Sequence, residues 1–268
     1  MMQPQHLILF DVDGTLTEAR KPIQKAMLKA LRELSRHAEI GFLTGSGLEY
    51  IKEQLWPALA DPIIRQNCHL LPCNGTEYVI PYGDEEIIFN AMSKEYMIEN
   101  IGKQDFINLM GLLCKLQAEL INENSDLPLT GNFVQNRGSM INWCPIGRNA
   151  EQEDRNIFQP LDNLYGIRRK YIQKLKDYIF AANMNVTVKL GGNTSFDIFP
   201  NGWDKTFALK HFEGSSWVFW FVGDRCSPIG NDYEIFTALK DSGRAYEVGS
   251  PEETIDIIDF HILRDLGA

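Results

Sequence analysis

Two aspartates, Asp11 and Asp13, stand one residue apart directly after an apolar run near the N-terminus. The run, residues 7–10, predicts a buried strand, and Gly14 allows the chain to turn sharply after it. Carboxylates at the C-terminal end of a strand can bind a cation or attack phosphorus. The pattern therefore places the expected chemistry at the sheet crevice of an α/β fold, with two solvated surface acids as the alternative.

A second acid cluster follows another apolar run late in the chain. Asp224 comes after residues 217–222, and Asp232 follows it. Because the carboxyl ends of parallel strands can meet at one edge of a sheet, Asp11, Asp13 and Asp224 would together supply oxygen ligands for Mg²⁺. For Asp232, a helix N-cap and a place around the metal both stay open.

A site that holds several carboxylates and a phosphate needs a cation besides Mg²⁺. Lys205 is a candidate for this cation, although a lysine near a helix start is usually a surface charge. Thr44 and Ser46 follow the predicted strand at residues 40–43. Either could donate a hydroxyl to the phosphate, and either could be a plain turn residue.

The order of predicted elements indicates two kinds of architecture in one chain. The chain opens with strand, helix, strand, helix and strand, which is typical of a parallel sheet, and it returns to this pattern from residue 217. The middle predicts helices over 94–120 and 165–182, paired strands over 133–143 and a hairpin over 186–199. We therefore predict an α/β fold: a Rossmann-like parallel-sheet core of residues 1–88 and 200–268, with an inserted α+β cap of residues 89–199.

Composition excludes several classes of protein. The 268 residues carry a formal charge of −10, which argues against a general nucleic-acid binder. The five cysteines form no Cys-x-x-Cys pair, which argues against zinc and redox motifs. The N-terminus has no basic region, and the apolar runs are too short for a signal or membrane segment. We expect a cytoplasmic protein without a membrane partner.

Asp-x-Asp-Gly-Thr at 11–15, the strand-end Thr/Ser, Lys205 and Gly-Asp at 223–224 resemble, in the same order, the four motifs of the haloacid dehalogenase superfamily. Three further stretches resemble the eukaryotic-type phosphomannomutase family: residues 137–155, 191–205 and 230–236. The likeness extends over essentially the whole chain. The sequence departs from the family at residues 137–140, 44–47 and 73–75, where the family has Arg-Asn-Gly-Met, Gly-Gly-Ser-Asp and Glu-Asn-Gly. The departures bear on contacts around the site and on substrate preference, and they leave the nucleophile, the metal-binding acids and the cap arginines in place.

The resemblance implies an aspartyl-phosphate mechanism. Asp11 would be the nucleophile and Asp13 the general acid/base. Asp11 and Asp224 would hold Mg²⁺, with the backbone carbonyl of Asp13 as a further ligand. The residues that would contact the sugar or its phosphates are Arg20, Arg137, Asn142, Arg148, Arg155, Ser195 and Asp197. Arginine also suits phosphate on physical grounds, because its planar fork binds two oxygens, although ion pairs with the neighbouring acids at 151, 153 and 154 are the alternative.

The implied reaction interconverts mannose 6-phosphate and mannose 1-phosphate, with a hexose 1,6-bisphosphate as activator and a possible homodimer through the cap. A Mg²⁺-dependent sugar phosphatase on the same scaffold is the alternative, since it needs the core acids but no grip on a second phosphate. A non-catalytic binding protein is a third possibility, and the presence of Asp11, Asp13 and Lys205 argues against it.

Overall fold

The computed structural model describes residues 5–214 and 216–268, and the chain divides into two compact units. The first unit, the core, holds the chain up to Lys94 and from Trp203 onward, and the second, the cap, is Glu95–Gly202. The sequence predicts these boundaries at 88/89 and 199/200, and both lie a few residues later in the structure. The first lies later because Ile88–Lys94 forms a strand that pairs with the core sheet.

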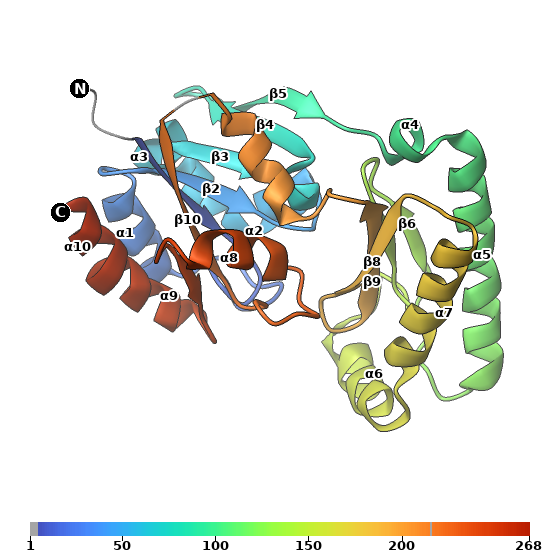
Figure 1. The fold of residues 1–268 in the computed structure, drawn as a ribbon. Helices are drawn as coiled ribbons and strands as arrows, with labels where there is room; N and C mark the ends of the chain where they lie inside the picture. The colour runs from blue at the N-terminus through green and yellow to red at the C-terminus, as the bar shows by residue number, and fades with distance from the viewer. Residues whose placement is uncertain (1–4, 215) are drawn as a thin grey trace. The chain divides into compact units, whose positions relative to one another are not determined.

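The core contains a seven-stranded sheet in the order β11-β10-β1-β2-β3-β4-β5 (Figure 1). The strands from β11 to β3 are parallel, and β4 and β5 join antiparallel at one edge. This arrangement confirms the predicted α/β core. The strand bounds are β1 Gln5–Phe10, β2 Glu39–Leu43, β3 Cys68–Leu71, β4 Glu77–Tyr82, β5 Ile88–Lys94, β10 Trp217–Gly223 and β11 Ala245–Glu247.

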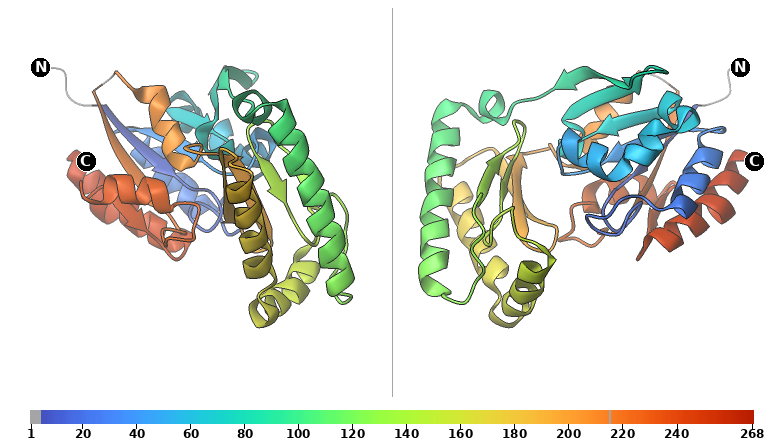
Figure 2. Two further views of the ribbon diagram at one scale, coloured as in Figure 1. Left: turned by 45° about the vertical axis from the view of Figure 1, so that its right-hand side comes forward. Right: turned by 180° about the vertical axis from the view of Figure 1, so that it is seen from behind.

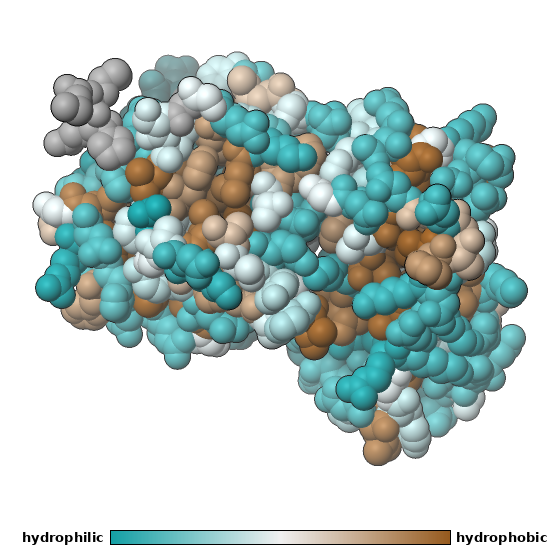
Figure 3. All heavy atoms as spheres, viewed as in Figure 1, coloured by the Kyte–Doolittle hydropathy of each residue, from teal (hydrophilic) through white to brown (hydrophobic). Residues whose placement is uncertain are grey.

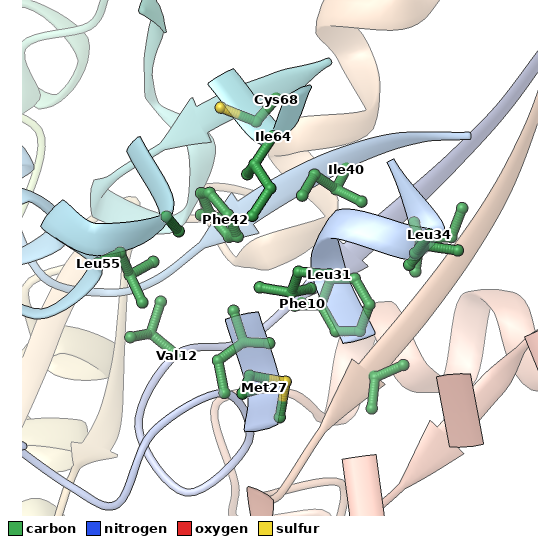
Figure 4. Close-up of a cluster of buried hydrophobic side chains, with 14 of the residues drawn as sticks. Phe10, Val12, Met27, Leu31, Leu34, Ile40, Phe42, Leu55, Ile64 and Cys68 are labelled. Atoms are coloured by element: carbon green, nitrogen blue, oxygen red, sulfur yellow. The ribbon is translucent and has the colours of Figure 1, made fainter. Parts of the chain in front are cut away.

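Alternation along β1 explains why helices cover both faces of the core sheet. Ile8 and Phe10 belong to the apolar cluster formed with the helices near the two chain ends, and Leu7 and Leu9 belong to a second cluster with η2 and α8. Helices lie on both sides of the core sheet (Figure 2), and Phe10 of the first cluster lies near Met27 and Leu31 (Figure 4). Successive strand side chains point to opposite faces, so an all-apolar strand must be buried on both. The helical segments are α1 Lys25–Leu34, α2 Leu48–Ala60, α3 Pro62–Gln66, η1 Cys73–Gly75, η2 Lys205–Phe212, α8 Tyr233–Lys240, α9 Pro251–Ile257, η3 Ile258–Ile262 and α10 Leu263–Leu266.

The cap is a four-stranded antiparallel sheet, in the order β6-β7-β9-β8, with helices against one face (Figure 1). Trp143 and Phe196 stack at 4.7 Å between ring centroids and share an apolar cluster with residues of α5 and α7. The predicted helix over 94–120 is two helices, because Gly102 breaks it with φ +85°. The bounds are α4 Met97–Ile101, α5 Lys103–Glu123, β6 Val134–Asn136, β7 Ile141–Trp143, α6 Gln152–Tyr165, α7 Ile167–Ala181, β8 Val186–Gly191 and β9 Ser195–Pro200.

The cap helices present a mainly hydrophilic outer surface with scattered apolar side chains (Figure 3). The exposed apolar residues on α6 and α7 are Ile157, Leu164, Tyr165 and Phe180. Among the described residues, no helix is both long enough and apolar enough to cross a membrane.

Candidate active site

The first aspartate lies where β1 ends. The backbone N–H of Asp11 donates to the Val222 carbonyl at 2.9 Å, so Asp11 extends the pairing with β10 and its carboxylate lies at the C-terminal edge of the sheet. Gly14 makes the following turn with φ +84°, and a Cβ there would lie 2.4 Å from Asp224 Oδ2. Glycine at this position therefore permits both the turn and the close approach of the second acid.

Three acids from distant parts of the sequence meet at this edge. Carboxylate oxygens of Asp11, Asp224 and Asp232 lie within 4.8 Å of one another. Among the described residues, the Oδ1 atom of Asp224 is buried and has no hydrogen-bond partner. An unsatisfied carboxylate oxygen beside two other acids fits a hard divalent cation such as Mg²⁺, which prefers oxygen ligands.

Lys205 is the buried cation of this cluster, while the partly exposed Arg225 guanidinium lies 3.7 Å from Asp224 Oδ2. The Lys205 side chain is fully buried, and its Nζ binds the carboxylates of Asp11 and, at 2.5 Å, Asp232. Asp204 begins η2 just before it and accepts the Thr206 N–H at 2.9 Å, so the helix start fixes the lysine. The alternative of a surface lysine does not hold.

Asp232 occupies the N-cap position of α8 but does not cap the helix. Its Oδ1 accepts from Lys205, and its Oδ2 accepts the Arg225 N–H at 3.0 Å. Asp232 therefore lies at the start of α8 and also beside Asp11 and Asp224. Its carboxylate orients Lys205 rather than the helix end.

Burial and mutual repulsion shape the titration of these groups. Burial raises the pKa of Asp11 well above its usual range, against the charge of Lys205, and the neighbouring acids raise it further. Burial and then Asp232 raise the pKa of Asp224 to about 6. Burial opposes the charge of Lys205, but Asp11 and Asp232 raise its pKa. Added positive charge at this edge would therefore stabilise the ionised carboxylates.

The hydrogen-bond partners of the Asp13 side chain differ from those of the three acids. The Tyr50 hydroxyl contacts both carboxylate oxygens of Asp13 at 2.9 Å, and Gln54 Nε2 donates to Oδ1 at 3.3 Å. The backbone N–H of Arg20 also donates to Oδ1, at 2.9 Å, while the residue itself is exposed. Sequence reasoning missed Tyr50 and Gln54, because nothing in the local pattern of α2 marks them as partners of Asp13.

The loop after β2, which carries Thr44 and Ser46, is connected by hydrogen bonds through Asn74 to the segment just before Lys205. Thr44 is buried, and its Oγ1 accepts the Ser46 N–H at 3.1 Å. The Thr44 carbonyl accepts the Asn74 N–H at 2.8 Å, and Asn74 Nδ2 donates to the Trp203 carbonyl at 3.2 Å. Asn74 was also missed as a bridging residue, and its φ of +62° lies in the left-handed region that asparagine tolerates.

The polar face of the cap sheet brings several predicted residues together. Asn142 pairs with Asp197 in register, and its Nδ2 donates to Asp197 Oδ1 at 2.7 Å and to Ser195 Oγ at 3.0 Å. A Cβ on Gly191 would lie 2.6 Å from Asp197 Oδ2, so glycine leaves room for these side chains. We call Asn142, Ser195 and Asp197 the cap polar cluster.

Two predicted arginines adjoin this cluster. Arg137 Nη1 lies 3.8 Å from Asp197 Oδ1. Arg155 is 7% exposed, and its guanidinium donates to the Ala150 carbonyl at 3.1 Å and to Thr194 Oγ1 at 2.9 Å. Arg148 is partly buried, and its backbone N–H donates to Asn132 at 3.1 Å. Because Arg155 is buried, it is not the surface arginine that the alternative required.

Comparison with known proteins decides the family. The family model described as eukaryotic phosphomannomutase matches residues 27–264. The chain belongs to the eukaryotic phosphomannomutase family. It is 36% identical to the phosphomannomutase of Saccharomyces cerevisiae over 262 residues, covering 96% of this chain and 94% of that one. It is 36% identical to that of Spinacia oleracea over 255 residues, covering 94% of each chain. These matches confirm the resemblance and the expected enzyme class, a phosphohexose mutase.

Similar solved structures support the fold alone. An N-terminally truncated IMP-nucleotidase of Plasmodium falciparum matches with a TM-score of 0.67 at 13% identity, covering 97% of this chain and 71% of that one. The C-terminal domain of a trehalose-6-phosphate phosphatase of C. albicans matches with a TM-score of 0.57 at 14% identity, covering 95% and 91%. At such identities, the likeness says that a core with a cap is shared, and function must be argued from the site.

Proposed function

We propose that this member of the phosphomannomutase family interconverts mannose 6-phosphate and mannose 1-phosphate through an aspartyl-phosphate and a hexose 1,6-bisphosphate. In the core, Lys205 binds Asp11 and Asp232 beside Asp224, and this arrangement suits phosphoryl transfer. The observation that favours a mutase over a phosphatase is the buried guanidinium of Arg155 beside the cap polar cluster, because a mutase must also hold a second phosphate.

The proposed chemistry needs one nucleophile and one proton donor. A carboxylate oxygen of Asp11 attacks phosphorus of the bisphosphate, and the bond from phosphorus to the sugar oxygen breaks. Asp13 gives its proton to that oxygen as it leaves. A hydroxyl of mannose 1-phosphate then attacks the aspartyl-phosphate while Asp13 takes its proton, and a bisphosphate forms. This bisphosphate turns end for end, so that Asp11 next takes its other phosphoryl group and mannose 6-phosphate leaves. A covalent intermediate divides one difficult transfer into two easier ones.

The remaining core groups stabilise charge in this scheme. Lys205 stabilises charge on the transferring phosphoryl group and holds Asp11 in place. Thr44 is the better candidate for the phosphate-binding hydroxyl, because its Oγ1 already accepts from Ser46 and its hydrogen can point to a phosphate oxygen. Asp11 and Asp224, with the Asp13 carbonyl, would hold Mg²⁺, and bound Mg²⁺ would neutralise charge on the phosphoryl oxygens. Asp232 would support this site through Lys205.

The cap residues bind the phosphate far from the nucleophile in this proposal. Arg137, Arg148 and Arg155 would contact its oxygens, and Arg20 would contribute from the core. Guanidinium groups suit this task because they stay charged and offer two parallel donors. Asn142, Ser195 and Asp197 would contact the sugar or its phosphate.

We expect the protein with Mg²⁺ and glucose 1,6-bisphosphate to convert mannose 1-phosphate into mannose 6-phosphate, and to release little free phosphate. A coupled assay for the isomer, run beside a phosphate assay, measures both products. Omitting the bisphosphate should slow the isomerisation, because the resting enzyme then has no phosphoryl donor. Phosphate release without isomer would reject the mutase and favour the sugar phosphatase.

Replacing Arg155 should weaken substrate binding. We expect Arg155→Met to raise the KM for mannose 1-phosphate about 10- to 100-fold, since a hydrogen bond to a charged group contributes about 1.5–3 kcal/mol. Steady-state kinetics measure the change. Arg169→Met is the matched control, because Arg169 is exposed on α7, and it should keep the normal KM. Equal KM values for the two variants would contradict the role of Arg155.

We also propose a cytoplasmic homodimer that forms through the cap. The exposed apolar side chains on α6 and α7, including Leu164 and Phe180, support this surface as the contact. Sedimentation of the purified protein tests the dimer.

A further inference from the structure

The carboxylate of Asp13 accepts hydrogen bonds from uncharged donors, two of which are side chains of α2. Tyr50 contacts both of its oxygens at 2.9 Å, and Gln54 donates to Oδ1 at 3.3 Å. Tyr50 and Gln54 are four residues apart on α2, so they lie on the same side of the helix. One rigid element therefore supplies both side-chain donors.

The orientation of Gln54 is itself fixed by a neighbour. The Thr17 hydroxyl lies 2.8 Å from Gln54 Oε1, and Thr17 is buried in the turn that also carries Asp13. Gln54 is 2% exposed, and its backbone carbonyl accepts the Ile23 N–H at 3.0 Å. With its oxygen turned toward Thr17, the amide nitrogen must face Asp13. The hydrogen bond from Gln54 to Asp13 is therefore held in place by the contacts of Gln54 with Thr17 and Ile23.

Of the two side chains, Tyr50 makes the shorter hydrogen bonds to Asp13. Its hydroxyl reaches both oxygens of Asp13, and these distances are shorter than the one from Gln54. The Tyr50 hydroxyl is the donor in these contacts, because an ionised carboxylate can only accept. A donor shared between both oxygens restricts rotation of the carboxylate about its terminal bond. Because a proton-transferring group must lie within hydrogen-bond reach of the atom it serves, this restriction bears directly on rate.

We propose that Tyr50, supported by Gln54, is a positioning residue that orients the Asp13 carboxyl group for proton transfer to and from the sugar oxygen. The proposal rests on the proposed function, in which Asp13 is the general acid/base. When the bond from phosphorus to the sugar oxygen breaks, the Asp13 proton passes to that oxygen, and it returns to Asp13 when the next hydroxyl attacks. Tyr50 keeps its own proton throughout.

The test compares two phosphoryl donors that differ in their need for a proton. Glucose 1,6-bisphosphate leaves a sugar alkoxide, which needs an acid, whereas acetyl phosphate leaves a stable carboxylate and does not. Acid-quench measurements of Asp11 phosphorylation give the rate with each donor. For Tyr50→Phe we expect the rate from the bisphosphate to fall at least about 10-fold, because general acid catalysis contributes about 10²–10⁴-fold. The rate from acetyl phosphate should change less than about twofold, because it needs little help from the acid.

Two further variants complete the design. Gln54→Met should show the same selective loss to a smaller extent, and it provides a second reading of the network should Tyr50→Phe prove unstable. Tyr82→Phe is the matched control, because Tyr82 is half-exposed on β4, and it should behave as the unaltered protein with both donors.

An unchanged bisphosphate rate in Tyr50→Phe would overturn the inference, and so would equal slowing with both donors, which indicates a merely structural role. Failure of the unaltered protein to form any phosphoenzyme would instead reject the proposed function.

Discussion

Asp11→Asn should abolish mutase activity while leaving the protein folded. The amide is a poor nucleophile, and removing an enzyme's nucleophile can cost as much as about 10⁶-fold in kcat. We expect a loss of at least about 10³-fold. The amide oxygen can still accept the hydrogen bond from Lys205 that the carboxylate accepts now. Coupled assays measure the rate, and thermal unfolding checks the fold.

The covalent intermediate gives this prediction a second measurement. Incubation with bisphosphate labelled in the phosphoryl group should leave acid-stable label on the unaltered protein and none on Asp11→Asn. Asp241→Asn is a matched control, because Asp241 lies at the exposed C-terminal end of α8. It should retain both activity and label. Label on Asp11→Asn equal to that on the control would mean that another residue carries the phosphoryl group.

The convergence of the acids could be predicted because it follows from a rule about sheets. Asp11 and Asp224 each follow an apolar strand, and the ends of neighbouring parallel strands must lie together. Nothing comparable locates Tyr50 or Gln54 next to Asp13. Their contact depends on how α2 packs on the turn after β1, which is a tertiary fact without a local sequence signal.

In the cap, too, some features could be predicted from the sequence and others could not. The alternation around residues 133–143 and 186–199 predicted its strands, since period two is a strong signal. Helix α6 was not predicted, although its apolar residues recur at helical spacing, because Pro160 lies inside it and a proline usually ends a helix. Burial of Arg155 could not be inferred from sequence either, because an arginine among acids is typical of a solvated surface.

Lys205→Met should destabilise the core strongly. Removing the lysine leaves two carboxylates, Asp11 and Asp232, buried without a cation. Breaking a buried ion pair by removing one partner costs about 3–5 kcal/mol. We expect a loss of this size in the free energy of unfolding, measured with urea. Lys210→Met on the same helix is the matched control. Lys210 is exposed, and its ammonium lies 4.4 Å from the centre of the Phe207 ring, so the control should lose less than about 1 kcal/mol.

The loss in Lys205→Met should depend on pH in a definite direction. Burial already holds the pKa of Asp11 above its usual range with Lys205 present, and removing the lysine raises it further. A group whose pKa is raised on folding favours the folded state below its unfolded pKa, and this contribution is lost as the pH rises through the folded value. Lys205→Met should therefore be closest to the unaltered protein in acid and furthest from it above neutrality. Urea unfolding at both ends of this range measures the trend, and an equal deficit at each would mean that lost packing, not unpaired charge, causes the instability.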